Sequence, residues 1–147
     1  MSFLNVHKTI PVAVILFKRD DRILFLRRIS KNTSNNTLSP LSGHVDAGET
    51  FTQAAVREAA EEIGVRIDPQ DLKPFHLMHR RLKDGREGVD MYFITEKWEG
   101  EPNNCEPERC SELQWIAKDN LPSDTLNFAR QAVEKGFAGE FYSEWWE

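Results

Sequence analysis

The sequence predicts an α/β or α+β fold in which helices flank a mixed β-sheet. Strand-like segments outnumber helical ones, and the two helical segments are separated along the chain by strands. The run from Val12 to Phe17 is apolar at every position, which is typical of a strand covered on both faces. A length of 147 residues favours one domain, and we expect it to span residues 1–147.

The N-terminal part of the chain predicts a hairpin followed by a loop. Apolar and β-branched residues fill 9–17 and 23–26, and two aspartates supply turn chemistry between them. Residues 31–42 are rich in Asn, Ser and Thr, so we expect a loop that leads to Gly43 and forms the rim of a pocket.

A helix is predicted over residues 52–63. Thr50 can cap it as a capping box with Gln53, and Gly64 is placed to end it. At about 100° per residue, apolar and charged side chains fall on opposite arcs. The apolar arc holds Ala55, Val56, Ala59, Ala60 and Ile63. The charged arc holds Arg57, Glu58, Glu61 and Glu62.

The C-terminal half alternates strands and loops before a second helix. We expect strands at 72–79, 89–97 and 112–117, a loop at 98–110, and a helix at 126–135 that stops at Gly136. The basic turn between the first two strands carries Arg80, Arg81, Lys83 and Arg86, which we expect to be solvated. The aromatic tail at 141–146 caps the core, pairs with a second subunit or covers the pocket, and the sequence does not choose among these.

Composition excludes several classes of protein. Lys and Arg number 19 and Asp and Glu 24, a net charge of −5 that argues against a nucleic-acid partner bound through bulk electrostatics. The longest apolar run is too short to cross a bilayer, so we expect no membrane partner. The first residues lack the pattern of a secretory signal, so we expect a cytoplasmic protein in which Cys105 and Cys110 are thiols.

The acidic helix arc is the most informative feature of the sequence. Glu58 precedes Glu61 and Glu62 by three and four positions, so three carboxylates project side by side, with Glu49 near the same helix entry. Their repulsion opposes folding, and a divalent cation such as Mg²⁺, which prefers oxygen ligands, removes it. The alternative is a solvated acidic helix face without a metal. Arg57, beside Glu58 and four residues before Glu61, can hold these carboxylates by charge-assisted hydrogen bonds, with Glu49 as its partner on the loop.

The spacing of these residues resembles the signature box of the Nudix hydrolases. The segment contains Gly43, five residues, Glu49, seven residues, and then Arg-Glu-Ala-Ala-Glu-Glu-Ile-Gly-Val at 57–65. Ala59 is smaller than the aliphatic residue usual in the family, but it is still apolar. The resemblance implies the Nudix fold, an α/β/α sandwich with a mixed β-sheet.

The resemblance also implies roles for individual residues. Glu58, Glu61 and Glu62 would ligate Mg²⁺, for which Mn²⁺ may substitute, and a glutamate or a loop residue would take a proton from the attacking water. Glycine at position 43 lets the backbone approach a metal closely, including the carbonyl of Ser42 or of Gly43 itself. His44 would contact phosphate or substrate, or would lie on the rim.

Two further segments are similar to the MutT-like branch, which hydrolyses nucleoside triphosphates. They are Phe25-Leu26-Arg27-Arg28 and Trp98-Glu99-Gly100-Glu101-Pro102. The resemblance implies that Glu106 adds a metal ligand or a base, with Glu108 and Glu112 as rivals. It also implies that Arg28 contacts phosphate. The asparagine of guanine-reading members is absent near 121–125; Asp124 or Asn127 would read a purine edge instead, and Phe75, Phe93 and Trp115 would stack on the base or fill the core.

We therefore expect a Mg²⁺-dependent hydrolase that binds a small nucleotide. It would cleave nucleoside triphosphates to the monophosphate and pyrophosphate by attack of water at phosphorus. The alternatives are an ADP-ribose or nucleotide-sugar pyrophosphatase and a non-catalytic nucleotide-binding module. The sequence is compatible with a monomer or a homodimer.

Overall fold

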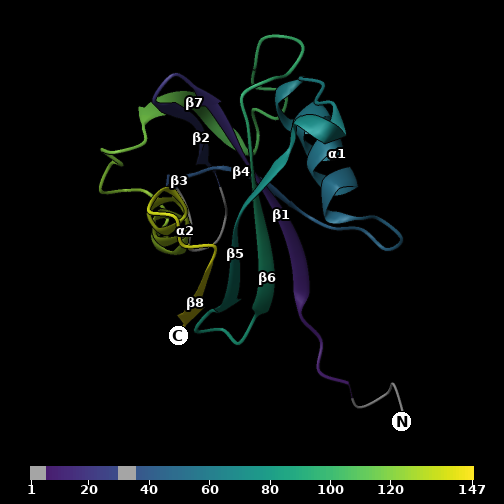
Figure 1. Cartoon of the computed structure of the whole chain (residues 1–147), viewed down its shortest axis with the longest axis vertical. Helices are drawn as coiled ribbons and strands as arrows, with labels where there is room; N and C mark the ends of the chain where they lie inside the picture. The colour runs from purple at the N-terminus through teal and green to yellow at the C-terminus, as the bar shows by residue number, and fades with distance from the viewer. Residues whose placement is uncertain (1–5, 30–35) are drawn as a thin grey trace.

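The computed structural model describes residues 6–29 and 36–147 (Figure 1). The elements in chain order are β1 (Ile10–Arg19), β2 (Arg22–Arg28), β3 (Leu38–Ser39), β4 (Leu41–His44), α1 (Phe51–Ile63), the 3₁₀ helix η2 (Pro69–Asp71), β5 (Lys73–Arg81), β6 (Glu87–Thr95), β7 (Cys110–Ala117), α2 (Asn127–Phe137) and β8 (Tyr142–Trp146). None of the helices in these two ranges is both long and apolar enough to cross a bilayer.

The strands form one mixed sheet, as predicted. Its order is β3-β2-β1-β6-β5-β8, with β4 paired to β1 and β7 paired to β2. β1 runs parallel to β6 and β5 runs parallel to β8, whereas the β1–β2 and β5–β6 pairs are antiparallel. Strands from both halves of the chain therefore meet at the centre of the sheet.

β1 is covered on both faces, which confirms the interpretation of its continuous apolar run. Side chains alternate along a strand, and those of β1 enter two separate cores. The core on the α1 side takes Ala13, Ile15 and Phe17, and the core on the α2 side takes Val12, Val14 and Leu16. In Figure 1 the two helices lie on opposite sides of the sheet, which confirms the expected sandwich of helix, sheet and helix.

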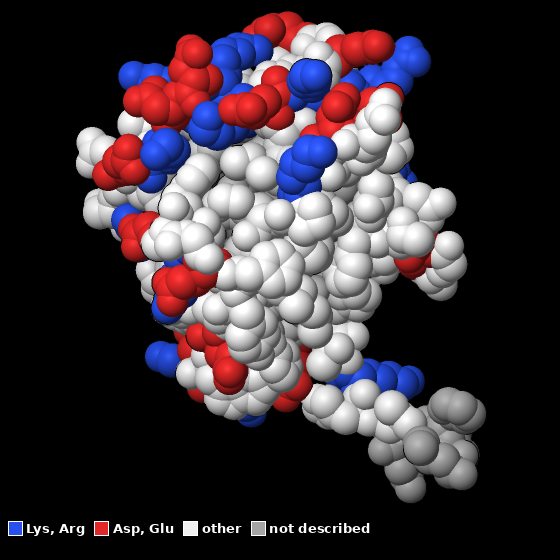
Figure 2. Space-filling model, in the orientation of Figure 1, with Lys and Arg blue, Asp and Glu red and all other residues white. Residues whose placement is uncertain are grey.

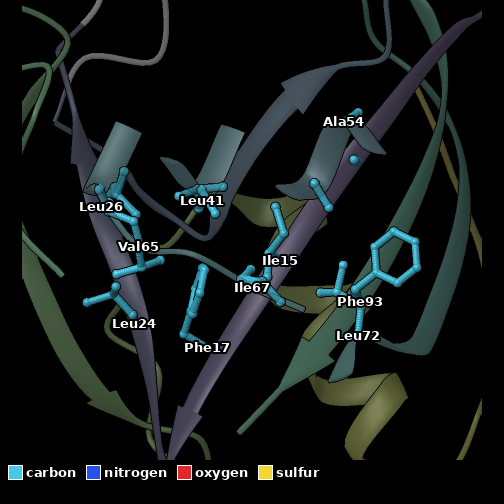
Figure 3. Packing of buried hydrophobic residues seen from close by; sticks show 14 of the residues in the cluster. Ile15, Phe17, Leu24, Leu26, Leu41, Ala54, Val65, Ile67, Leu72 and Phe93 are labelled. Carbon is cyan, nitrogen blue, oxygen red and sulfur yellow. The ribbon is translucent and has the colours of Figure 1, made fainter. Parts of the chain in front are cut away.

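The core on the α1 side anchors the acidic helix to the sheet. Figure 3 shows Ile15 and Phe17 of β1 among Leu24, Leu26 and Leu41 from the neighbouring strands. Ala54, Ala55, Ala59 and Ile63 supply the helix side of this core. Because three of these four are alanines, the helix lies close to the sheet.

Helix α1 has the predicted ends but a different buried face. The Thr50 hydroxyl accepts a hydrogen bond from the Gln53 amide (3.1 Å), the Gln53 side chain accepts one from the Thr50 amide (2.9 Å), and Gly64 closes the helix at φ 70°. The assignment of the whole apolar arc to the core was wrong at Ala60, which is exposed, whereas Glu62 is buried. The helix is rotated toward its acidic side, because β2 and the loop after β6 also pack against it.

Two further details differ from the prediction. The expected loop at 31–42 contains β3 and the start of β4, and its residues 31–35 lie outside the described part of the chain. Helix α2 continues through Gly136 to Phe137 instead of stopping at the glycine. Gly136 is needed for packing, because a Cβ atom there would lie 2.3 Å from the Phe75 ring. Both cysteines are free, as expected.

The aromatic tail forms the last strand of the sheet. β8 pairs in parallel with β5, with Leu77 opposite Tyr142 and Arg81 opposite Trp146. The buried His76 ring holds this strand, because its Nε2 atom lies 2.7 Å from the Ser143 hydroxyl and its Nδ1 atom 2.8 Å from the Glu140 carbonyl. Of the three roles left open for the tail, covering the edge and core of the sheet is the one seen in the structure.

Removal of the cap of α1 should cost stability without altering the core. We expect Thr50→Ala to lower the free energy of unfolding by about 1 kcal/mol, because the Gln53 amide loses its acceptor. Urea unfolding measures this change. Thr52→Ala, at the second residue of the same helix, is the matched control and should be neutral or slightly stabilising. Equal losses in both variants would contradict a specific capping effect.

Candidate active site

The three glutamates of α1 differ in their exposure to solvent. The side chain of Glu62 is 8% exposed, that of Glu58 is 14% exposed, and that of Glu61 is 54% exposed. This gradient follows from the rotation of the helix, which turns Glu62 toward the sheet. The acidic arc is therefore a partly buried site and not a fully solvated face.

Arg57 is the centre of a network that holds the acidic side chains, as predicted. Its guanidinium donates to both carboxylate oxygens of Glu49 (2.8 and 3.0 Å), to Glu58 (2.8 Å) and to Glu61 (3.3 Å). It also donates to the backbone carbonyl of His44 (3.1 Å), which links α1 to β4. The hydrogen bond from Arg57 lowers the pKa of Glu49 to about 2, so Glu49 is ionised at neutral pH.

Gly43 lies directly against Glu58. A Cβ atom at position 43 would lie 2.2 Å from the Glu58 carboxylate carbon and from Oε1, so no larger residue fits without moving the carboxylate. The structure therefore gives a reason for glycine here, the close approach of β4 to α1, while the approach of its backbone to a metal stays a prediction. The backbone carbonyls of β4 are consequently near the acidic site.

Glu62 is the most perturbed carboxylate of the site. Its pKa is raised to about 7, mainly by burial and in smaller part by the nearby Glu58 and Glu106 charges, while Arg28 acts in the opposite direction. The Arg28 guanidinium donates to Glu62 Oε1 at 3.4 Å, and Oε2 is buried without a hydrogen-bond partner among the described residues. Burial likewise raises the pKa of Glu58.

Glu106 joins the site from the loop between β6 and β7. The amide groups of Asn103 and Cys105 donate to the carbonyls of Ile63 (3.0 Å) and Glu62 (3.1 Å), so the loop is fastened to the end of α1. Oε2 of Glu106 is buried without a hydrogen-bond partner in the described part of the chain, and the Arg109 guanidinium lies 3.8 Å from it. The charge of Glu106 raises the pKa of both Glu58 and Glu62.

The two rival glutamates of this region lie elsewhere. Glu112 accepts a hydrogen bond from Arg27 at 2.9 Å, and Glu108 is exposed on the loop. The geometry therefore favours Glu106 among the three.

The residues of this site fit a divalent cation. Across residues 6–29 and 36–147, no three acidic, histidine or cysteine side chains are already gathered at ligand spacing, and Arg57 and Arg28 donate hydrogen bonds to the carboxylates. However, Glu62 and Glu106 each bury a carboxylate oxygen that has no hydrogen-bond partner among the described residues, and burial, the main cause of the raised pKa values of Glu58 and Glu62, penalises their charged forms. A hard cation that takes oxygen ligands would satisfy both deficits.

A cavity of about 310 Å³ opens on the α2 side of the sheet, next to the acidic site. It is lined by Val12, Val14, Arg28, Ser39, Pro40, Ser42, Gly43, His44, Arg80, Asp90, Tyr92, Leu126 and Phe128. Four of the residues predicted from the sequence, namely Arg28, Ser42, Gly43 and His44, therefore meet at its wall. Arg28 is at the junction, because it lines the cavity and also pairs with Glu62.

The cavity also contains residues that the sequence interpretation missed. Arg80 was assigned to a solvated basic turn, and this was wrong: it belongs to β5, and its side chain is 12% exposed and paired with Asp90. The signal available in the sequence was Asp90, an acidic residue between the apolar Val89 and Met91 of the predicted strand. Its partner could not be identified without the register of β5 on β6.

The expected base-reading residues lie outside the cavity wall. Asp124 accepts a hydrogen bond from Arg27 at 2.7 Å, which lowers the pKa of Asp124. Asn127 borders a different surface hollow. Phe93 is buried in the core and Trp115 packs against it, as the alternative interpretation expected.

A methyl group at position 43 should disable this site. We expect Gly43→Ala to reduce kcat/KM by about 100-fold, because Glu58 must leave its position. Steady-state hydrolysis measures the loss. Gly85→Ala is the matched control: Gly85 has φ +86° and open space around it, so the variant should lose stability and keep its activity. Wild-type activity in Gly43→Ala would contradict the assignment.

Comparisons with known proteins agree with this arrangement. The NUDIX domain family model matches residues 7–136. The chain is 30% identical over 127 residues to the 8-oxo-dGTP diphosphatase of Escherichia coli (strain K12), covering 86% of this chain and 94% of that protein. It is 28% identical over 112 residues to the NAD-capped RNA hydrolase NudC of Salmonella heidelberg (strain SL476), covering 76% of this chain but only 40% of that protein.

A solved structure shows the same fold. The MutT NUDIX hydrolase from Burkholderia pseudomallei superposes with a TM-score of 0.80 at 26% identity, covering 87% of this chain and 98% of that one. The family match extends over most of the chain and includes both the acidic helix and the cavity. The chain therefore belongs to the Nudix family of pyrophosphohydrolases.

Proposed function

We propose that this Nudix hydrolase cleaves nucleoside triphosphates to the nucleoside monophosphate and pyrophosphate with Mg²⁺ as its cofactor. One observation carries the proposal: the acidic site and the cavity adjoin, and Arg28 belongs to both. A nucleotide has the matching shape, with a flat base at one end and a charged polyphosphate at the other. The similarity to an 8-oxo-dGTP diphosphatase supports a triphosphate as the substrate.

In this proposal the base and the phosphates would have different surroundings. The cavity walls are largely apolar, with Val12, Val14, Leu126 and Phe128, which suits a base. Arg28 at the junction presents a planar fork of donors, which suits the oxygens of a phosphate group. His44 lines the same wall near this junction and would contact the substrate.

The acidic residues would hold the metal and take up the proton of the attacking water. Glu58, Glu61, Glu62 and Glu106, with the backbone carbonyl of Ser42 or of its neighbour in β4, are the proposed ligands. When bound, Mg²⁺ would neutralise phosphate charge and lower the pKa of bound water. Arg57 and Glu49 keep the carboxylates oriented. Glu106 has a buried oxygen with no hydrogen-bond partner in the described ranges and is the proposed acceptor of the proton.

The proposal is tested with a substrate panel in the presence of Mg²⁺. The panel contains canonical and oxidised nucleoside triphosphates, ADP-ribose, nucleotide sugars and dinucleoside polyphosphates, and products are identified as well as quantified. We expect monophosphate and pyrophosphate from triphosphates with kcat/KM of about 10⁴ M⁻¹s⁻¹ or more. Rapid cleavage of ADP-ribose or a nucleotide sugar alone would replace the proposal with the second substrate class. No hydrolysis of any member would contradict it.

A further inference from the structure

The Arg80–Asp90 pair on the cavity wall has no part in the hydrolysis described above. Arg80 Nε donates to Asp90 Oδ2 (2.7 Å), and Nη2 donates to Oδ1 (3.0 Å). Asp90 is 1% exposed and lies beneath the guanidinium, whereas Arg80 reaches the cavity. Burying such a pair often stabilises a protein less than apolar residues of similar volume would. Stability alone therefore does not explain its presence.

The strands are arranged to hold the Arg80 guanidinium in one orientation. Gly88 lies opposite Arg80 in the β5–β6 register, and a Cβ atom there would lie 2.6 Å from Nη2. The absence of a side chain at this position lets the guanidinium lie flat and reach Asp90. The Phe128 ring of α2 packs on it at 4.8 Å from its centroid. Asp90 is consequently a positioning residue for Arg80.

The pair leaves half of the guanidinium available to a ligand. Asp90 occupies the side of the fork made by Nε and one N–H of Nη2. A guanidinium has five N–H groups, so the end formed by Nη1 and the second N–H of Nη2 is still able to donate. No residue in the described part of the chain accepts a hydrogen bond from this end.

The charge of the pair selects the kind of acceptor. The Asp90 carboxylate balances the Arg80 charge, and Val12, Val14 and Leu126 line the same cavity, so a neutral acceptor is preferred to an anion. Phosphate is better accommodated at Arg28, beside the proposed metal site. A planar fork of two donors fits two adjacent acceptor atoms on a flat group.

We infer that Arg80 reads the nucleobase and favours guanine and cytosine over adenine and uracil. Guanine presents O6 beside N7 and cytosine presents O2 beside N3, and each pair offers two neighbouring acceptors. Adenine places an amino group beside N7, and uracil places an N–H between its carbonyls, so neither offers a matching pair to the fork. The inference rests on the proposed function, because it assigns the base of the same nucleotide.

The test measures base preference in two independent ways. The first is kcat/KM for GTP, CTP, ATP and UTP with Mg²⁺, and the second is calorimetric binding of the four nucleoside monophosphates without metal. In the wild type, we expect guanine or cytosine nucleotides to be favoured about 10- to 100-fold over adenine and uracil in both measurements. If guanine is read through O6 and N7, 8-oxo-dGTP should be a poorer substrate than dGTP, because oxidation turns N7 into a donor.

Two variants separate recognition from folding. Arg80→Lys keeps a positive charge beside Asp90 but has no fork, and Arg80→Met with Asp90→Leu replaces the whole pair by apolar residues, which the fold should tolerate. Both should reduce the base preference to less than about threefold in kcat/KM and in monophosphate binding. The exposed pair Asp84 and Arg86, changed to Asn and Gln, is the matched control and should keep the wild-type preference.

Each outcome bears on one of the two proposals. A base preference that persists in Arg80→Lys and in the apolar double variant would overturn the inference. The inference would also be overturned if the wild type bound all four monophosphates equally or bound none of them. Selective binding of the guanine or cytosine monophosphate without hydrolysis of any triphosphate would contradict the proposed function and support the inference. Hydrolysis of all four triphosphates at equal rates would support the proposed function and contradict the inference.

Discussion

Glu62→Gln is expected to reduce kcat/KM by on the order of 10³-fold and to make the metal-free protein more stable at pH 8. The loss of activity follows from the loss of a proposed metal ligand, whose charge would balance the cation. The gain in stability follows from burial, which raises the pKa of Glu62 to about 7 in the folded protein from an ordinary value of 4.5. An uncharged amide of the same shape avoids the cost of burying that charge.

The sign of the pH dependence is determined by this raised pKa. Between pH 4.5 and 7 the folded protein retains a proton on Glu62 that the unfolded chain releases. The free energy of unfolding therefore falls as pH rises through this window, by at most about 3 kcal/mol from this group. A Gln side chain does not titrate, so the stability gain should be near zero at pH 4.5 and largest above pH 7.

Metal binding should show the opposite dependence on pH in the wild type. A cation binds the ionised carboxylate, so the apparent Kd for Mg²⁺ should decrease as pH rises from 6 to 8. Thermal unfolding with and without Mg²⁺ at several pH values measures both effects. Glu134→Gln, on the exposed side of α2, is the control and should leave activity and the metal response unchanged. Retention of the Mg²⁺ response by Glu62→Gln together with Glu61→Gln would contradict the metal site.

Arg57→Ala is expected to lower kcat/KM by about 10²- to 10³-fold and to destabilise the protein by about 2 to 3 kcal/mol. The change removes the donor shared by Glu49, Glu58 and Glu61, so acidic side chains that now face one guanidinium would repel one another. A carboxylate that shifts by about 1 Å loses its catalytic geometry. Steady-state kinetics and urea unfolding measure the two losses.

Arg57→Lys separates charge from geometry. A single ammonium group cannot donate side by side to Glu49 and also reach Glu58 and the His44 carbonyl. Most of the stability should therefore return in this variant, while kcat/KM should still be reduced at least tenfold. Full activity in Arg57→Lys would show that Arg57 supplies only charge to the site.

Local features of the sequence were sufficient to predict most of the elements. The capping box at Thr50 and the closing glycine at position 64 depend on contacts within a few residues, and both are present in the structure. The continuous apolar run of β1 predicted a strand buried on both faces, because successive side chains of a strand point to opposite faces and all of these are apolar. The spacing from Gly43 to Glu62 predicted which side chains gather at α1, because a helix fixes which of them are neighbours.

The burial of the acidic arc was decided by the tertiary structure. A helical wheel separates apolar from charged residues, but it does not show how the helix is rotated on the sheet. Ala60 was assigned to the core and is exposed, whereas Glu62 was assigned to the charged face and is buried beside Arg28 of β2. The pKa of Glu62 depends on that rotation, so the sequence could not indicate it.

What the sequence determined by itself is the chemical inventory of the site: glycine, arginine and glutamates at fixed spacing on one helix and its preceding loop. What only the tertiary structure decided is the cavity beside them, because its wall brings β1, β2, β4, β5, β6 and α2 together. Arg80 and Asp90 appear as a turn residue and a strand residue in the sequence, and they become a buried pair through the β5–β6 register. Contacts between segments far apart in the chain therefore form the cavity and bring Arg28 and Glu106 to the acidic site, whereas spacing within one helix and its preceding loop determines which glutamates adjoin Arg57.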